Sequence, residues 1–306
     1  MKRAPKDFCI ICLKGLAMGA ADVVPGVSGG TIAFISGIYE ELIDTINKIN
    51  LNTFKILRKQ GFIAAWKSIN GSFLISLLLG ICISFLSLAQ LIKWLLENKP
   101  ILVWSFFFGL VLASIYFVAK QLDKWNFIHI VALIIGAIIA YIITVIPALH
   151  SNNTPWFMFI AGALAICAMI LPGISGSFIL VLLGAYKPVL NALLNKDFKI
   201  LFFLIFGAIV GLLSFSRLLK WMFAHHKNTT LAVLTGFLVG SLNKIWPWKK
   251  VLQSEIINGK LKIISEIGVS PFHYQGDNQL LLSILLALSG LGLILLLEKV
   301  AQTKSE

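Results

Sequence analysis

The stretch Pro25-Gly-Val-Ser-Gly-Gly30 lies inside an apolar segment, and Pro172-Gly-Ile-Ser-Gly-Ser177 repeats its pattern 147 positions later in another. A glycine-rich break inside a membrane-embedded helix is costly, because the backbone groups that it releases find no water in lipid. Membrane proteins keep such breaks mainly where they line a polar cavity, and breaks at corresponding positions of two halves indicate a substrate site. The pair therefore predicts a binding site between two related halves of a membrane protein.

The composition is that of an integral membrane protein. The 306 residues are 58% hydrophobic and only 13% charged, with a mean hydropathy of +0.91, which excludes an ordinary soluble domain. Several stretches approach the roughly 20 apolar residues that cross a bilayer. We expect spans over residues 73–96, 101–120, 127–147, 198–223, 229–246 and 279–297. The basic N-terminus leads into an apolar run with no small-residue cleavage site after it, so we expect this segment to be retained.

The net charge of +13 does not point to nucleic acid in a chain of this composition. Basic loops of membrane proteins set topology and contact anionic lipid headgroups, and no basic soluble domain with interleaved aromatic residues is present. The four cysteines, Cys9, Cys12, Cys82 and Cys167, all fall in apolar segments, and the histidines lack metal-ligand spacing. We therefore expect bilayer lipids as partners, and no metal, no cofactor and no catalytic residue.

Two regions of the chain align without gaps, residues 15–48 with residues 162–195. Nine residues are identical across this alignment, and the resemblance continues at an offset of 127, where Lys93-Trp94 corresponds to Lys220-Trp221. The matches cluster on Pro, Gly and Trp in one order, which indicates a shared architecture. The identical residues of the first region are Gly15, Ala21, Pro25, Gly26, Ser28, Gly29, Ile32, Gly37 and Tyr39.

Each half is predicted to be a broken, re-entrant helical hairpin followed by three transmembrane helices. The first half, residues 1–150, has its hairpin over 8–48, a basic loop over 49–70 and spans within 73–147. The second half, residues 151–306, has its hairpin over 156–194, spans within 198–297 and a long loop over 247–278. A hairpin returns to its own side, so three further spans leave the second half inverted. We expect an all-α membrane protein with two inverted repeats.

Loop charges predict a cytoplasmic N-terminus. The loop over residues 49–70 carries Lys55, Arg58, Lys59 and Lys67 on the same predicted side as the basic N-terminus, whereas residues 148–156 carry no lysine or arginine. This asymmetry follows the positive-inside tendency. Residues 248–278 depart from it, because they carry four lysines on the predicted outer side. That loop is long, which weakens the tendency there.

The two breaks suit an anionic ligand. Proline donates no backbone hydrogen bond and glycine permits unusual backbone conformations, so the chain restarts a helix after each break, with Ser28 or Ser175 expected to cap it. A helix start favours an anion by only about 0.3–1 kcal/mol, so two facing starts and a cation are needed for a selective phosphate site. Serine-capped kinks are the alternative. The predicted headgroup contacts are Gly26, Ser28, Gly29, Gly30, Thr31, Gly173, Ser175, Gly176, Ser177 and Arg217.

Basic residues near the ends of the second-half spans are the next candidates, since ionisable residues in spans mark functional sites by default. Arg217 lies deepest, and its planar fork suits a phosphate. Lys220 lies three residues later on the same face, and either gating or snorkelling to the interface explains it. Lys244 belongs to an interfacial cluster. It either anchors the chain at the membrane interface or contacts a lipid headgroup.

Two acidic residues are candidates for coupling or gating. Asp22 lies three residues before the first break, and its repeat counterpart is Met169. It either carries a coupling proton or caps a local backbone group. Glu40 corresponds to Lys187, so opposite charges lie on equivalent helices of the two halves. A charge-linked gate and ordinary interfacial placement both fit this pair.

Four segments resemble the bacterial polyprenyl-phosphate (undecaprenyl phosphate) transporter family, PopT type. They are residues 19–31 (GAADVVPGVSGGT), 171–177 (LPGISGS), 214–221 (SFSRLLKW) and 240–248 (GSLNKIWPW). The likeness covers essentially the whole chain. It implies a flippase, not an enzyme, that returns undecaprenyl phosphate across the bacterial cytoplasmic membrane and so recycles the carrier lipid of envelope synthesis. The lipid's identity comes from this resemblance alone.

Under this hypothesis the phosphate is held between the repeats while the isoprenoid tail stays in lipid. A small-anion channel or exporter is the main alternative, because helix-start anion sites do not discriminate a lipid phosphate from a free one. A lipid-phosphate-processing membrane enzyme is disfavoured, because no His/Asp or Arg/His constellation stands at the breaks. Ion coupling and homo-oligomerisation stay open.

Overall fold

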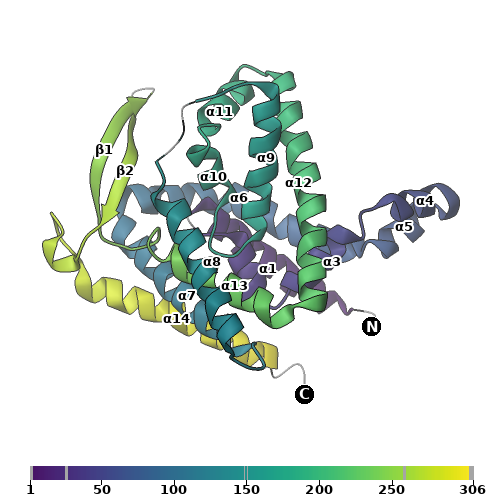
Figure 1. The fold of residues 1–306 in the computed structure, drawn as a ribbon, viewed down its shortest axis with the longest axis horizontal. Helices are drawn as coiled ribbons and strands as arrows, with labels where there is room; N and C mark the ends of the chain where they lie inside the picture. The colour runs from purple at the N-terminus through teal and green to yellow at the C-terminus, as the bar shows by residue number, and fades with distance from the viewer. Residues whose placement is uncertain (1–2, 25–26, 148, 150, 258–259, 303–306) are drawn as a thin grey trace.

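The computed structural model describes residues 3–24, 27–147, 149, 151–257 and 260–302, and their fold is mainly helical (Figure 1). Pro25 and Gly26, the latter a predicted headgroup contact, lie outside the described residues. The first half contains α1 (Pro5–Val23), α2 (Gly29–Ile35), α3 (Tyr39–Asn47), α4 (Leu51–Gln60), α5 (Phe62–Ser68), α6 (Gly71–Asn98), α7 (Pro100–Lys120) and α8 (Phe127–Val145). The second contains α9 (Pro155–Ile170), α10 (Gly176–Leu182), α11 (Tyr186–Leu194), α12 (Phe198–His225), α13 (Lys227–Ser241) and α14 (Leu280–Gln302).

Long apolar helices make this a multi-pass membrane protein. Within the described ranges, α6, α7, α8 and α12 are each long and apolar enough to cross a bilayer, and a fifth span is added if the bent pair α10–α11 counts as one. α13 is shorter than predicted, because it ends at Ser241 after 15 residues and not near residue 246. Residues 242–245 form turns, and Pro247 disfavours helical geometry at Trp246, so no regular helix reaches the predicted end.

Glycines bring α1 against α6 and α9 against α12 at corresponding positions. Gly15 on α1 packs on the backbone carbonyl of Leu77, and Gly162 on α9 packs in the same way on that of Leu204. A Cβ atom at either glycine would overlap the carbonyl oxygen. Both pairs keep the offsets of the sequence alignment, so the first helix of each half is held to its first long span by the same contact.

The last spans of the two halves are exchanged. α14 packs on α7, where Gly109 meets the carbonyl of Ala287, and α8 packs on α13, where Gly236 meets the carbonyl of Leu133. Each half therefore contributes its final span to the other half. The four helices α7, α8, α13 and α14 lie together at the lower side of the molecule in Figure 1. This interlocking joins the halves into one body.

The return arms of both hairpins are broken a second time. Each return arm consists of two short helices, because α2 and α10 end at turns that contain Gly37 (φ 71°) and Gly184 (φ 70°). Ile38 N–H donates to the Ala33 carbonyl at 3.0 Å, the bond expected when a helix ends on a left-handed glycine. The α10–α11 pair bends by 104° at its turn.

The interval 247–278, expected as a long loop, contains a β-hairpin. Strands β1 (Lys249–Ile257) and β2 (Lys260–Gly268) pair antiparallel, Lys249 lies opposite Gly268, and a short 3-10 turn, η1 (Pro271–His273), follows. The hairpin stands beside the helices at one end of the molecule in Figure 1. Trp246 Nε1 donates to the Val269 carbonyl at 2.9 Å, which ties the base of the hairpin to the segment after α13.

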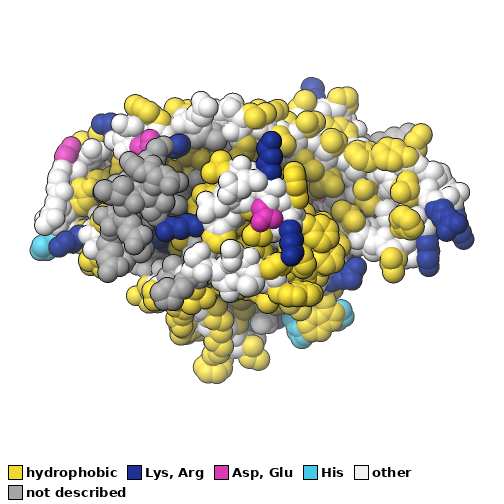
Figure 2. Space-filling view, turned by 90° about the horizontal axis from the view of Figure 1, so that it is seen from above, with side chains coloured by type: hydrophobic (Ala, Val, Ile, Leu, Met, Phe, Trp, Pro, Cys, Tyr) yellow, Lys and Arg dark blue, Asp and Glu magenta, His cyan; other side chains and the backbone are white. Residues whose placement is uncertain are grey.

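The basic loop over residues 49–70 forms two short helices, α4 and α5, that project from the opposite end of the molecule (Figure 1). Asn50 caps α4 through its side chain, and Gly61 (φ 83°) separates the two helices. Figure 2 shows Lys and Arg side chains gathered on this end beside exposed hydrophobic side chains. The exposed residues include Leu51, Phe54, Lys55, Arg58, Lys59, Phe62 and Ile63.

Candidate functional site

The first break starts a new helix under two side-chain caps. Ser28 is the N-cap of α2, and its Oγ accepts a hydrogen bond from the Gly30 N–H at 3.0 Å, which confirms the predicted cap. Asp22, in the last turn of α1, accepts from the Gly29 N–H through Oδ1 at 2.7 Å. This is the local capping contact that the sequence left open for Asp22. The first two amides of α2 therefore have protein partners.

Contacts from the first break reach directly to the second. The Ser28 Oγ lies 3.0 Å from the Met169 carbonyl oxygen and 3.1 Å from that of Leu171, at the end of α9. Thr31 Oγ1 accepts a hydrogen bond from the Gly173 N–H at 2.9 Å. A Cβ atom at Gly30 would lie 2.4 Å from the Ile170 carbonyl oxygen. The two breaks thus meet, and only glycine permits so close an approach at position 30.

The second break differs from the first in its cap. Ser175 is the N-cap of α10 but makes no side-chain cap, so the predicted capping role of Ser175 is wrong. Its Oγ pairs instead with the Ser177 Oγ at 2.9 Å. Gly173 has φ +87° and packs on Ser241 of α13, so a side chain there would be both strained and crowded. Gly176 packs on the Ala165 carbonyl of α9.

The junction of the two breaks is a buried polar centre. Ser28, Thr31 and Ser175 are 0%, 1% and 4% exposed, and helices of both halves surround them. Buried hydroxyls need partners, and these three have them. Gly29, Gly30 and Gly173 are three of the predicted headgroup contacts, and the amide of each donates to a protein acceptor in this conformation.

Two of the predicted cations, Arg217 and Lys220, lie on α12. Arg217 is exposed and makes no hydrogen bond or ion pair within the described part of the chain. Lys220 pairs with Asp44 of α3 at 2.7 Å, and both side chains are about half exposed. Glu40 and Lys187 are both exposed, on α3 and α11. Among the described residues, no hydrogen bond or ion pair joins Arg217 to either break.

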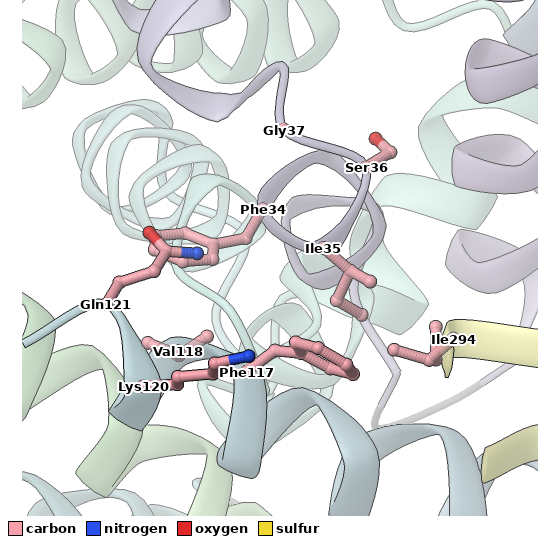
Figure 3. Close-up of a pocket in the computed structure, with 9 residues that line it drawn as sticks. All are labelled: Phe34, Ile35, Ser36, Gly37, Phe117, Val118, Lys120, Gln121 and Ile294. Carbon is pink, nitrogen blue, oxygen red and sulfur yellow. The ribbon is translucent and has the colours of Figure 1, made fainter. Parts of the chain in front are cut away.

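A cavity of about 310 Å³ lies at the far end of α2 from the first break (Figure 3). Its lining is mostly apolar, with Lys120 and Gln121 of the end of α7 on one side. Figure 3 shows the Gln121 amide turned toward the Phe34 ring. Phe34, Ile35, Ser36, Gly37, Phe117, Val118 and Ile294 complete the lining. Elsewhere in the described ranges, no group of three His, Cys, Asp or Glu side chains is placed to hold a metal ion.

Comparison with known proteins decides the family. Residues 18–261 match the VCA0040-like family, which is described as undecaprenyl phosphate translocase-like. The chain belongs to this family. Two relatives are named polyprenyl-phosphate transporter. The one from Vibrio cholerae serotype O1 is 48% identical over 295 residues, which cover 95% of this chain and 96% of the relative. The one from Staphylococcus aureus is 36% identical over 253 residues, which cover 77% and 85%. No solved structure matches the chain.

The region matched by this translocase-like family contains both breaks, Arg217 and Lys244. Lys244 lies in a second cluster, at the base of the β-hairpin, whose other charged members the sequence analysis missed. Glu266 Oε1 lies 3.3 Å from Lys244 Nζ and 3.0 Å from Lys249 Nζ. The ammonium of Lys249 lies 4.0 Å from the centre of the Trp104 ring, and that of Lys244 lies 5.0 Å from the centre of the Phe178 ring.

Burial shapes the acid–base behaviour of this second cluster. The Lys249 side chain is only 11% exposed, and desolvation lowers its pKa to about 8, although the nearby Glu266 carboxylate opposes this shift. The pKa of Glu266 is lowered, because the attraction of Lys249 and Lys244 outweighs its own burial. The signal missed in the sequence was the spacing of Lys249 and Glu266 at paired ends of two strands, which becomes visible only once the hairpin is recognised.

Proposed function

We propose that this protein transports polyprenyl phosphate and returns undecaprenyl phosphate from the outer to the inner leaflet of the bacterial cytoplasmic membrane. The observation that carries this proposal is the 48% identity, over nearly the full length of both chains, to a relative named polyprenyl-phosphate transporter. The multi-pass helical fold suits such a substrate, because a lipid must cross the bilayer beside the protein. The reaction is translocation and changes no covalent bond of the lipid.

Alternating access between two inverted repeats is the proposed mechanism. Matched contacts of α1 with α6 and of α9 with α12 support two equivalent halves. Inversion is supported by the direction of the exchanged spans. Gly236 meets Leu133 and Gly240 meets Ala137, so α13 and α8 run the same way. Two short connections separate α6 from α8, whereas one separates α12 from α13. With a reversal of direction at each connection, the equal directions of α8 and α13 support two halves that point oppositely.

The proposed headgroup site is the junction where the breaks meet. A single helix start would contribute little, but hydroxyls of Ser28, Thr31 and Ser175 and the amides of both breaks converge in one buried place. The Asp22 carboxylate accepts the hydrogen bond of the Gly29 N–H. A phosphate oxygen that binds this N–H must therefore take the place of the carboxylate. Headgroup binding therefore requires the breaks to separate and to exchange protein acceptors for phosphate oxygens.

Arg217 is proposed to supply positive charge when the breaks separate. Cys167 of α9 donates its thiol to the Gly211 carbonyl of α12, and α9 and α12 run in the same direction. Ile170 follows Cys167 by three residues and Arg217 follows Gly211 by six, so Arg217 lies within about one helical turn of the depth of the second break. A guanidinium there suits bidentate contact with phosphate.

The apolar cavity beside α2 is suited to part of the isoprenoid tail. Its lining from α2, α7 and α14 is mainly hydrophobic, and α2 connects it to the junction at the other end of the same short helix. A tail in this position would leave the headgroup near Ser28 and Thr31. The rest of the tail would remain in lipid.

Translocation by protein reconstituted in liposomes tests the site. A fluorescent polyprenyl phosphate reports movement when a membrane-impermeant quencher removes the signal of the outer leaflet. We expect Arg217→Gln, and Ser28→Leu combined with Ser175→Leu, to abolish movement. Ser28→Ala should weaken it, because cap and cross-contacts are both lost. The matched control is Ser114→Ala, since Ser114 is equally buried but its hydroxyl bonds only the Leu110 carbonyl of its own helix. Full activity in correctly folded site variants would refute the site.

Asp22 is proposed as the carrier of a coupling proton. Asp22→Asn keeps an acceptor for the Gly29 amide but removes the titratable group. We expect this variant to translocate lipid without any response to an imposed pH gradient. An unaltered response to the gradient contradicts coupling through Asp22 and leaves the transport proposal intact.

A further inference from the structure

The cluster at the base of the β-hairpin has an excess of positive charge in a confined place. Two ammonium groups, those of Lys244 and Lys249, share a single oxygen of the Glu266 carboxylate. One carboxylate leaves one positive charge uncompensated. The two lysine side chains are 22% and 11% exposed, so water supplies little of the missing stabilisation.

Aromatic rings form the walls around these two cations. Trp104 of α7 faces Lys249 and Phe178 of α10 faces Lys244. Trp246 follows Lys244 by two residues, and its ring centre lies 5.5 Å from that of Trp248 and 5.4 Å from that of Phe108. Tryptophan at such positions is typical of the membrane–water interface, where a lipid headgroup and the start of its tail lie at one depth.

The geometry of the shared oxygen is that of an oxyanion bridged by two ammonium groups. Glu266 Oε1 at 3.0 and 3.3 Å from the two nitrogens occupies the position that one phosphate oxygen would take. A phosphate monoester offers up to two negative charges and three acceptor oxygens, so it would balance both lysines better than one carboxylate does. Glu266 therefore resembles an internal substitute for such a ligand.

We propose that Lys244 and Lys249 form a second binding site, for a phosphate monoester, and that the Glu266 carboxylate holds their ammonium groups until the phosphate replaces it. The inference rests on the proposed function for its preferred source, the headgroup of a polyprenyl phosphate. Inorganic phosphate shares the same chemistry and is the other source. Phe178 directly follows Ser177 of the second break, so a headgroup leaving this site would next meet the proposed junction.

Protection from acylation tests the site locally. The full chain in detergent is treated with acetic anhydride in the presence of undecaprenyl phosphate, undecaprenol or inorganic phosphate, and each lysine is quantified by mass spectrometry. We expect undecaprenyl phosphate to protect Lys244 and Lys249 and undecaprenol to protect neither. Lys250 is the internal control, because it is exposed and lies next to Lys249 outside the cluster. Protection by inorganic phosphate alone would assign the site to free phosphate.

Variants of Glu266 and Lys244 show whether each side chain weakens or strengthens binding of the lipid phosphate. Glu266→Gln should lower the half-protecting lipid concentration by about fivefold, since it removes one competing charge. Lys244→Gln should raise that concentration at Lys249 by about tenfold or more, and Lys244→Arg should restore it. Lys250→Gln should leave the half-protecting lipid concentration unchanged. If Glu266→Gln does not fold, the two variants Lys244→Gln and Lys244→Arg decide alone whether this site binds the phosphate.

Several results would overturn this inference. They are equal protection of Lys250, absence of protection by every phosphate probe, or weaker binding by a folded Glu266→Gln variant. A wild-type protein that translocates lipid without protecting either lysine contradicts this site and leaves the proposed function standing. Protection in a wild-type protein that translocates nothing contradicts the proposed function and leaves this site standing.

Discussion

At the scale of single residues, the meeting of the two breaks depends on a few buried polar contacts. The hydrogen bond from the Gly173 N–H to Thr31 Oγ1 links one half to the other across 142 positions of sequence. Thr31 is 1% exposed, so water cannot replace a lost partner. An unsatisfied buried donor costs more than the net value of the bond itself.

Thr31→Val therefore should destabilise the protein by about 1–3 kcal/mol, because Gly173 loses its acceptor without a change in side-chain volume. The matched control is Thr235→Val. Thr235 is also 1% exposed, but its hydroxyl donates to the Leu231 carbonyl of its own helix. Thermal unfolding in detergent measures both, and equal shifts in Tm would contradict a special role for Thr31.

Lys249 offers a prediction about pH. Burial lowers its pKa to about 8, so the neutral, reactive amine appears at lower pH in the folded protein than in the unfolded chain. Competitive acylation across pH, normalised to the plateau, should give a midpoint near 8 for Lys249. The same peptide in denatured protein should titrate near the ordinary lysine value of 10.5. Coinciding midpoints would show that folding does not desolvate this amine.

The two serines at the N-cap positions show how far residue types alone can carry a prediction. Ser28 and Ser175 hold the same position in equivalent motifs, and both were expected to cap. Only Ser28 does, whereas Ser175 faces the Ser177 hydroxyl, which the first break replaces by Gly30. The meeting of the breaks was predictable from the repeat, but the choice of partner for each donor depends on the exchange of contacts across the junction.

At the scale of elements, glycine decides where the return arms end. Gly37 and Gly184 occupy the same repeat position, and both adopt a positive φ at the turn after a seven-residue helix. They were recognised as repeat matches but not as helix ends, because no proline or polar cluster marks the turns. At the second of these turns, α10 and α11 bend by 104°.

Gly37→Ala should destabilise the protein by about 1 kcal/mol, since a left-handed backbone costs an L-residue roughly that much. No atom lies within 4 Å of the Cβ position, so the effect is conformational and not steric. Gly292→Ala is the control, because Gly292 also has open space but lies within α14 with no positive φ. We expect no loss of stability for it, and equal losses in thermal unfolding would argue against the turn.

The β-hairpin was missed although the sequence carries its signal. Asn258-Gly259 stands between β1 and β2, and this dipeptide between β-branched runs is a strong hairpin indicator. The lysines of this interval indicate topology but carry no information about strand pairing. The spans were easier to predict, because long apolar runs have one stable solution in lipid.

The projecting pair α4 and α5 tests the orientation. We expect this pair to face the cytoplasm, because Lys55, Arg58 and Lys59 follow the positive-inside tendency. A cysteine in place of Lys59, in a background without native cysteines, should resist a membrane-impermeant maleimide in intact cells. A cysteine in place of Asn153 should react. Labelling of position 59 and not of 153 would reverse the assigned orientation.

At the scale of the whole molecule, the exchange of the last spans is the feature that sequence could not supply. The pattern identifies α8 and α14 as apolar segments, but lipid offers no hydrophobic force that selects their neighbours. Small residues select these neighbours instead. Gly109 and Gly236 let α7 and α13 approach the final span of the other half. The exchanged helices therefore pack each half against the other, which fits the proposed alternating access.

Transport by purified protein in liposomes tests the central claim most directly. Liposomes receive fluorescent undecaprenyl phosphate in one arm and trapped radiolabelled inorganic phosphate in the other. We predict movement of the lipid between leaflets, its inhibition by unlabelled undecaprenyl phosphate, and no release of inorganic phosphate. Release of inorganic phosphate with the lipid left in its original leaflet would contradict a lipid transporter and indicate an anion channel.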